Sequence, residues 1–453
     1  MFENVLGQAA AAQLIKDIKG AALAPAMLFS GPAASGKGTA ALELGRVISC
    51  EEKTNNTIAA WNCGCSACAR HRLLVHPDLL CLGPRPFSAE IAASAGTFKR
   101  DISASQETKG PQSRVLFIRS VRKLLSRFNP VLWEDDPKAA KMFLLVNSIE
   151  EDLDELDFLA RQGFAEQSSV EQSSVLKLTE GIIKNAIKLE SEGMSENIPI
   201  AQIRRAAWWC RLAPSGKGKL LVIENADRML EEARNAMLKL LEEPPGRVTI
   251  VLCTPRPGSL LRTMVSRLRP YRFSSRDAAV EEEVVRRVFK DQIHPSGRLA
   301  DYLDSFLPVS GETLEALAAF FASNLAYKAV KTKRTVAEEV VLLGKYCTPK
   351  AQAAGYGRPN GDSAALIAFI LEKAEKFEIR SLFSRFLSCL LEQAASSQKP
   401  PSSVPSPLPN PAYNELWKKH SLWAETAVQV YKLRPGQVLE KIFTDLSRGM
   451  AEL

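Results

Sequence analysis

Long apolar runs are missing from this sequence, and their absence excludes one large class of proteins. No stretch of about 18 consecutive apolar residues occurs in the chain, so we expect no membrane-spanning helix and no membrane partner. A signal peptide would need positive charge at the start and then an apolar run, and Glu3 and Asn4 stand there instead. We therefore expect a cytoplasmic protein.

The sequence also lacks a strong excess of either charge. Its net charge of +8 and its pI near 8.9 are compatible with nucleic acid, but the charge is too mild and diffuse to establish contact. A composition of 46% hydrophobic and 24% charged residues is ordinary for a soluble globular protein. The length predicts about two to four domains.

What the sequence does contain is a glycine-rich stretch between Gly31 and Gly38. It follows the phosphate-loop pattern G-x-x-x-x-G-K, but Gly38 stands where a Ser or Thr should follow the lysine. A buried strand is expected at 27–29 and a helix at 39–48, which is the context that the loop needs. Loop amides and the helix N-terminus then bind phosphate, and the lysine reaches the outer phosphates. The candidate nucleotide-binding residues here are Gly31, Gly36, Lys37, Gly38 and Thr39, the last supplying the missing hydroxyl if the loop is shifted by one residue.

A second expected strand, at 219–223, ends in acidic residues. In nucleotidases of this type such a strand end supplies an Asp that orients Mg²⁺ and a Glu that polarises water. Glu224 can replace the first through a water molecule, but Asn225 cannot act as a base, and the loss of a base costs about 10²–10⁴-fold in rate. Binding of ATP with Mg²⁺ therefore stays open, and hydrolysis is expected to be weak or absent. The alternative is that Glu224 and Asp227 form a solvated strand end.

Four of the nine cysteines are clustered. Cys50, Cys63, Cys65 and Cys68 lie within 19 residues, whereas the other five are scattered. In a reducing compartment this clustering indicates a metal site rather than disulfides. The C-x-C spacing between Cys63 and Cys65 is tight for chelation, and His71 is an alternative ligand for one position.

The middle of the chain has a different character. Residues 85–197 contain a polar Ser- and Gly-rich stretch, helical spacing of apolar residues over 117–128, and the tandem repeat Glu-Gln-Ser-Ser-Val at 166–175. We expect a surface insertion that is partly helical and partly disordered. It is either a tolerated spacer or a partner-docking hairpin. Beyond residue 274 the pattern is helical, with a Pro/Ser-rich loop at 396–412.

A run near residue 240 carries a family resemblance. Leu238-Lys-Leu-Leu-Glu-Glu-Pro-Pro245 is followed by an expected strand, Thr254, and then Ser266-Arg267. With Val5-Leu-Gly-Gln8, the glycine loop, the cysteines and the acidic strand end, this ordered set resembles the small subunits of bacterial DNA polymerase III clamp loaders, members of the AAA+ class. The resemblance covers residues 2–82 and 198–273.

The resemblance implies a three-part architecture. Residues 1–273 are expected to form an α/β AAA+ core with a parallel sheet, a zinc module at 50–68 and the insertion at about 85–197. A small helical lid is expected at 274–318, followed by an all-α collar at 319–453.

The resemblance also implies roles for particular residues. Lys37 matches the phosphate-binding lysine, Thr254 the residue that senses the γ-phosphate, and Arg267 the arginine that is presented in trans to a neighbouring subunit's ATP. For Arg267 the alternative is a surface ion pair. The family's zinc module implies that Cys50, Cys63, Cys65 and Cys68 hold a structural Zn²⁺, the alternative being a site that has lost its metal.

The ATPase subunits of such complexes keep the hydroxyl and the Asp-Glu pair that this chain lacks. Gly38, Glu224 and Asn225 therefore resemble the delta-prime type. The implied function is support of ATP-dependent loading of a sliding clamp on primed DNA, in a hetero-oligomeric ring with gamma/tau-like ATPase subunits and a delta-like clamp-opening subunit. Two alternatives stay open: an active gamma/tau-type ATPase, and an AAA+ protein of DNA repair or recombination.

Overall fold

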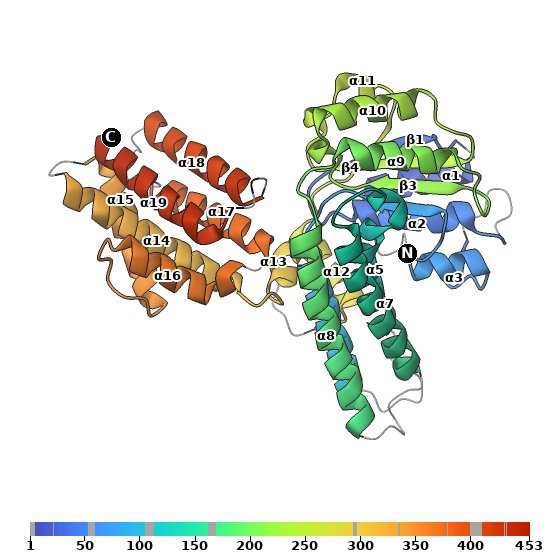
Figure 1. Cartoon of the computed structure of the whole chain (residues 1–453), viewed down its shortest axis with the longest axis horizontal. Helices are drawn as coiled ribbons and strands as arrows, with labels where there is room; N and C mark the ends of the chain where they lie inside the picture. Colours follow the sequence, from blue (N-terminus) through green and yellow to red (C-terminus); the bar gives the residue numbers. More distant parts are fainter. Residues whose placement is uncertain are drawn as a thin grey trace. The chain divides into compact units, whose positions relative to one another are not determined.

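The computed structural model describes most of the chain. The described residues are 5–20, 22–52, 59–104, 113–161, 169–292, 297–333, 336–377, 379–398, 410–429, 431 and 433–453. They belong to two compact units, residues 1–306 and 307–453, which are coloured blue to yellow and orange to red in Figure 1. Within the described part, no helix combines the length and the apolar character needed to cross a membrane.

A parallel sheet of five strands organises the first unit. The strands are β1 (Ala26–Ser30), β2 (Leu79–Leu82), β3 (Lys219–Ile223), β4 (Val248–Thr254) and β5 (Arg269–Arg272), in the spatial order β2-β3-β4-β1-β5. Every residue of β1, β2 and β3 is buried. This burial is typical of parallel strands that are covered by helices on both faces, and the expected α/β core with a parallel sheet is present.

Successive strand residues divide between two apolar layers, because side chains alternate along a strand. Met27 and Phe29 of β1 pack with buried residues of α1 (Ala9–Lys19) and α2 (Lys37–Ser49). Leu28, which lies between them, belongs to the cluster on the other face. That cluster includes α9 (Ile200–Arg211) and α10 (Glu231–Glu242).

The partly helical character expected for the segment 85–197 is confirmed, but its expected location at the surface is wrong for much of the segment. Its described residues form α4 (Ser88–Ala104), α5 (Ser113–Leu125), α6 (Pro130–Trp133), α7 (Ala139–Arg161) and α8 (Ser169–Gly193). Phe87, Phe98 and Phe117 are fully buried in the same cluster as Leu28 and Leu80 of the sheet. Aromatic residues just before α4, within α4 and within α5 therefore make this segment part of the core.

Two long helices carry the rest of that segment. In Figure 1, α7 and α8 run side by side and point away from the sheet. The tandem repeat that we expected to be a low-complexity surface segment begins at 166–168, which lies outside the described residues, and continues into α8. Val175 at its end is completely buried, so the repeat contributes to the contact between the helices.

The remaining elements of the first unit are short. They are the helices α3 (Ser66–Arg72), α11 (Arg262–Val265), α12 (Ala278–Val288) and α13 (Leu299–Asp304) and the 3₁₀ helices Ser126–Phe128 (η2), Ala226–Arg228 (η3) and Pro257–Ser259 (η4). Helices α12 and α13, in the region expected as a lid, share a small apolar cluster with Ala93 of α4. They belong to the first unit, whose boundary falls after Phe306.

All the secondary structure of the described residues of the second unit is helical. The helices are α14 (Gly311–Thr332), α15 (Glu338–Ala353), α16 (Ser363–Lys373), the 3₁₀ helix Glu375–Phe377 (η5), α17 (Arg380–Ser396), α18 (Pro411–Gln429) and α19 (Pro435–Glu452). Phe321 of the central helix α14 meets Phe386 of α17 and Phe443 of α19 edge to face. Most of the Pro/Ser-rich loop at 396–412 lies outside the described residues. The expected helical C-terminal region is present.

A carboxylate from α8 holds the start of α4. Glu190 accepts hydrogen bonds from the backbone amides of Phe87 (3.2 Å) and Ser88 (2.8 Å) and from the Ser88 hydroxyl (2.6 Å). These amides belong to the first turn, where a helix has no acceptor of its own. Glu190 therefore caps α4 from a distant part of the chain and ties α8 to it.

We expect Glu190→Ala to lower the free energy of unfolding by about 2 kcal/mol, because it leaves part-buried donors without an acceptor. Chemical denaturation followed by circular dichroism measures this loss. Glu180→Ala in the same helix is the control: Glu180 pairs with Lys99 at the surface, and such a pair contributes less than about 1 kcal/mol. Equal losses for the two variants would contradict the capping role of Glu190.

Candidate nucleotide-binding loop and metal centre

The glycine-rich loop connects β1 to α2, as the sequence predicts. Gly31 has φ +147°, and a Cβ on it would lie 2.1 Å from the backbone oxygen of Phe273. Gly36 has φ +93° and immediately precedes α2. Both positions therefore require glycine, because larger residues rarely adopt such backbone angles or would collide.

The loop lysine is turned toward its own loop. The ammonium group of Lys37 donates hydrogen bonds to the carbonyl oxygens of Gly31 (2.7 Å) and Pro32 and to the Ser35 hydroxyl (3.2 Å). Burial lowers its pKa. Thr39 is half-buried in α2, and one residue along a helix is a rotation of about 100°, so its side chain does not replace the missing one at position 38.

The acidic strand end is engaged in ion pairs. A Cβ on Gly38 would lie only 2.3 Å from Oε1 of Glu224, which brings these two sites together. The other carboxylate oxygen, Oε2, pairs with Arg127 and with Nε of Arg85 at 3.2 Å. Burial acts to raise the pKa of Glu224, but the two arginines outweigh it and lower the pKa. The carboxylate is 12% exposed, so the alternative of a solvated strand end is wrong for Glu224.

The neighbouring polar residues are also paired. The amide of Asn225 donates to the carbonyl oxygen of Pro84 at 2.6 Å. The Thr254 hydroxyl donates to Asp227 at 2.8 Å, and Asp227 also accepts from Nε and Nη2 of Arg256 at 3.0 and 2.8 Å. Thr254 is completely buried. The side chains expected to sense the γ-phosphate and to orient a metal are therefore bound to other protein groups.

These residues do not fit ATP with Mg²⁺ in the manner of a hydrolytic phosphate loop. Position 38 has no hydroxyl, and the carboxylate of Glu224 fills the space next to it. Asn225 carries an amide in place of a carboxylate base. The backbone of the loop retains its phosphate-loop form, but the groups that would hold the metal and activate water are replaced or occupied.

The arginine expected to act in trans lies on the surface. Arg267 follows α11, and its guanidinium pairs with Glu242 at 2.9 Å and donates to the carbonyl oxygen of Thr263 at 2.7 Å. Its side chain is 37% exposed. The ion pair that we considered as the alternative is present, and its exposure makes it weak.

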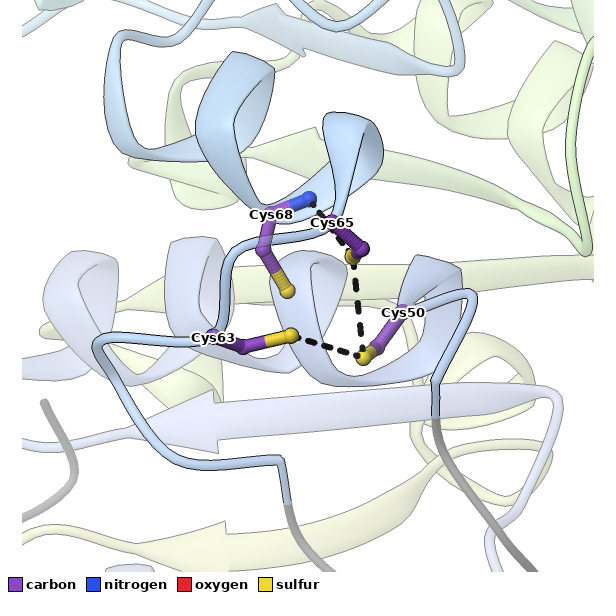
Figure 2. Close-up of side chains that lie close together, drawn as sticks. All are labelled: Cys50, Cys63, Cys65 and Cys68. Atoms are coloured by element: carbon purple, nitrogen blue, oxygen red, sulfur yellow. Dashed lines mark hydrogen bonds between the residues drawn. The ribbon is translucent and has the colours of Figure 1, made fainter.

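The four clustered cysteines come together. Their sulphur atoms all lie within 4.8 Å of one another, and Figure 2 shows the four side chains converging from the end of α2, the loop before α3 and the start of α3. Cys50 Sγ is 3.8 Å from Cys63 Sγ and 3.9 Å from Cys65 Sγ. Zn–S bonds of about 2.3 Å in a tetrahedron imply S–S separations of about 3.8 Å. The sulphurs therefore fit a Zn²⁺ ion, in spite of the tight C-x-C spacing.

His71 is not part of this group. Its ring stacks on His76 with 4.2 Å between centroids, and neither of its ring nitrogens has a hydrogen-bond partner within the described chain. Burial, with nearby positive charge, lowers its pKa to about 3. The expectation that His71 could replace a thiol is therefore wrong, and its imidazole is a neutral packing group.

A buried arginine supports the cysteine cluster. Arg46 donates to Cys68 Sγ at 3.3 Å and to the carbonyl oxygens of Ala59 and Ala60 at 2.7 and 3.0 Å. Both carboxylate oxygens of Glu43 accept from the same guanidinium. A Zn²⁺ held by four thiolates carries a net charge of −2, so the positive charge of Arg46 would stabilise the loaded site as well as position its loop.

Sequence reasoning missed three basic residues of α5 and η2. Arg119, Lys123 and Arg127 are spaced by four, which places them on one face of a helix. Arg119 donates to the carbonyl oxygen of His71 at the end of α3, and Lys123 pairs with Glu90. The spacing of the three was visible in the sequence, but their partners lie far away along the chain.

The fold and the two sites define an α/β protein with a phosphate-type loop at the start of α2 and a four-cysteine centre at the other end of that helix. Comparison with known proteins narrows this class. The chain belongs to the family described as DNA polymerase III, delta subunit, whose family model matches residues 7–155 and 157–277. These ranges include more than half of the chain and run through most of the segment that we expected to be an insertion.

Two relatives match shorter stretches. The chain is 32% identical over 124 residues to DNA polymerase III subunit delta′ of Pseudomonas aeruginosa, which covers 27% of this chain and 36% of that one. It is 37% identical over 70 residues to DNA polymerase III subunit delta′ of Bacillus subtilis, which covers 15% and 21%. The matches thus span about a third and about a fifth of these relatives.

One solved structure also aligns with part of the chain. It is a DNA polymerase III gamma subunit-related protein from Thermotoga maritima, with 19% identity and a TM-score of 0.27, and the alignment covers 57% of this chain and 82% of that one. A TM-score this low carries no argument about the fold.

We expect the protein to hold one Zn²⁺ per chain. Arg46→Met should weaken the binding of Zn²⁺ by about 10–100-fold, because the substitution removes a supporting positive charge. Competition with a chromophoric chelator measures the affinity, and Cys65→Ser should release the metal. Glu43→Gln breaks the same ion pair but keeps the guanidinium, and Arg70→Met changes an exposed arginine of α3, so both should retain tight binding. Unchanged affinity in Arg46→Met would contradict the role of Arg46.

Proposed function

We propose that this chain is a delta-prime-like subunit of a replicative clamp loader with an AAA+ core. Its family and its partial matches to proteins named DNA polymerase III subunit delta′ support this proposal. In this role the chain joins a hetero-oligomeric ring with gamma/tau-like ATPase subunits and a delta-like clamp-opening subunit. Through that complex it supports ATP-dependent loading of a sliding clamp on primed DNA.

The observation that carries this choice of subunit is the state of Glu224. The carboxylate is bound by Arg85 and Arg127 and fills the space beside Gly38. An active gamma/tau-type ATPase would need a carboxylate there that is free to orient a metal. The chain's own ATP hydrolysis is therefore weak or absent, and its contribution to catalysis lies elsewhere.

Arg267 is the proposed contribution, as an arginine finger to the neighbouring subunit's ATP. Its pair with Glu242 is exposed on both sides, and such a pair contributes no more than about 1 kcal/mol. A phosphate of a neighbouring subunit can therefore displace Glu242 at little cost. A guanidinium that reaches the transition state in this way contributes about 10³–10⁵ in rate.

We expect the purified chain alone to show no ATP hydrolysis above background, because it lacks a base and a free metal-orienting group. A coupled phosphate-release assay with excess ATP and Mg²⁺ measures this. Turnover at the rate of an ordinary motor subunit, unaffected by Asn225→Ala, would contradict our interpretation of the strand end and favour the active ATPase.

In the reconstituted complex, we expect Arg267→Ala to reduce DNA- and clamp-stimulated ATP hydrolysis at the adjoining site by at least about tenfold. Arg262→Ala removes another exposed arginine of α11 and should leave the rate unchanged. Glu242→Ala removes the surface pair but keeps the arginine, and it should not reduce the rate. Equal losses in Arg267→Ala and Glu242→Ala would show that Arg267 acts only through its ion pair.

A further inference from the structure

The carboxylate of Glu224 lies next to Gly38, at the end of the loop where the phosphate-loop motif binds Mg²⁺. In the phosphate-loop motif, the residue at position 38 carries the hydroxyl that binds Mg²⁺. Here a Cβ at that position would lie 2.3 Å from Oε1 and 3.5 Å from Cδ of Glu224. The carboxylate therefore occupies the space into which that hydroxyl would project, and glycine is the residue that leaves it there.

The carboxylate is held in this place from its other side. Arg127 and Arg85 both pair with Oε2, and the side chains of Glu224 and Arg127 are 12% and 6% exposed. Moving Glu224 away would leave the buried guanidinium of Arg127 without its carboxylate partner, which is strongly unfavourable. It would also remove one of the two carboxylate partners of the partly exposed Arg85. A larger residue at position 38 would thus meet a fixed obstacle rather than a flexible side-chain end.

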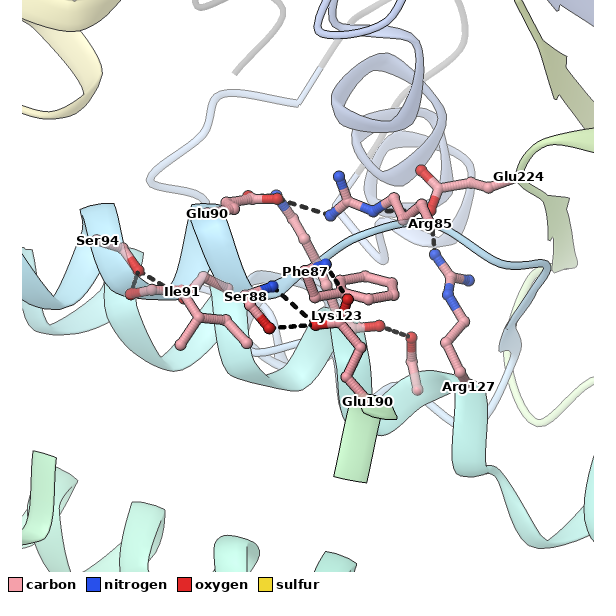
Figure 3. A network of polar contacts seen from close by, with 12 residues as sticks. Arg85, Phe87, Ser88, Glu90, Ile91, Ser94, Lys123, Arg127, Glu190 and Glu224 are labelled. Atoms are coloured by element: carbon pink, nitrogen blue, oxygen red, sulfur yellow. Dashed lines mark hydrogen bonds and ion pairs between the residues drawn. The ribbon is translucent and has the colours of Figure 1, made fainter. Parts of the chain in front are cut away.

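The two arginines connect the loop to helices α4 and α5. Arg85, just before α4, also pairs with Glu90 of that helix at 2.7 Å. Lys123 of α5 pairs with the other oxygen of Glu90, and these positive neighbours lower the pKa of Glu90 to about 2. Figure 3 shows the resulting chain of alternating charges, from Arg127 through Glu224 and Arg85 to Glu90 and Lys123.

We propose that this chain of charges is a structural joint, in which the carboxylate of Glu224 has replaced the metal-binding end of the loop and fixes α4 and α5 to the nucleotide-type core without any ligand. Gly38 is the partner that makes the joint possible. A Mg²⁺–nucleotide complex does not fit beside Gly38 while the joint is closed. This inference concerns how the core is held together and does not depend on the chain's place in a clamp loader.

A double-substitution cycle on the full-length chain tests the joint. Alanine is favoured over glycine within a helix by a factor of about two to five in the unfolding equilibrium. Gly181→Ala in α8, where a Cβ would meet nothing within 4 Å, should show this gain. Gly38→Ala should instead raise the unfolding equilibrium constant by at least about tenfold, because the new methyl group forces Glu224 from its arginines.

The effect of Gly38→Ala on stability should change sign when the carboxylate of Glu224 is removed or shortened. In a Glu224→Ala background, Gly38→Ala should stabilise the chain as Gly181→Ala does, by a factor of up to about two to five, because Gly38 lies in the first turn of α2. Glu224→Asp keeps the charge and withdraws it by one methylene group, and it serves the same purpose if Glu224→Ala does not fold. A Gly38→Ala effect that is equal in all backgrounds would overturn the joint.

Titration with a fluorescent ADP, in Mg²⁺ and in EDTA, tests the metal-free state of the loop. We expect Mg²⁺ to leave the binding of ADP to the wild-type chain unchanged, whether that binding is measurable or below detection. Binding that Mg²⁺ strengthens tenfold or more, with the gain lost in Glu224→Ala, would show that Glu224 orients a metal and would overturn the proposal. The stability cycle depends on folding alone, so it can fail while the proposed function holds.

Discussion

One buried carboxylate explains much of the arrangement around the glycine-rich loop. An ionised group removed from water costs several kcal/mol unless charged partners compensate it, and Glu224 finds them in Arg85 and Arg127. Both guanidinium groups also lie over the ring of Phe87, with that of Arg85 4.4 Å and that of Arg127 5.4 Å from the ring centroid. The charge at the strand end thus ties the segment before α4 and the residues after α5 to the sheet.

Helix α5, with η2 at its end, connects the surroundings of Glu224 to those of the cysteine centre. Arg119, Lys123 and Arg127 follow one face of α5 and η2, and they contact the end of α3, Glu90 of α4 and Glu224, respectively. Near α3, Trp61 lies close to three guanidinium groups, of Arg46, Arg72 and Arg119. A Zn²⁺ bound by four thiolates would bring a net negative charge to this basic surrounding. The basic face of α5 and η2 therefore runs from the Glu224 carboxylate to the neighbourhood of the cysteine centre, and it places positive charge near both.

How much of this the sequence could predict depends on the distance between partners. The strand, loop and helix around Lys37 were predicted because all their signals lie within about twenty residues of one another. Four cysteines in one short stretch likewise predicted their own convergence. The pairing of Arg127 with Glu224 spans 97 residues, and nothing local to either residue indicates the other. The surface location expected for segment 85–197 was wrong for the same reason: its polar start suggested a surface insertion, but Phe87 and Phe117 are buried against a sheet formed by distant strands.

The glycines that suggested a nucleotide site have reasons of their own in the fold. Gly31 lies against the backbone of Phe273, just after β5, where a Cβ would come within 2.1 Å of the carbonyl oxygen. Gly36 adopts φ +93° to begin α2, and Gly38 leaves space for Glu224. None of these requirements involves a phosphate. A chain that used its loop only to join β1, α2 and the helices of 85–197 would still need glycine at each of these positions. The presence of the glycine pattern is therefore no argument for ATP binding. The residues between and beyond the glycines decide the chemistry of the loop.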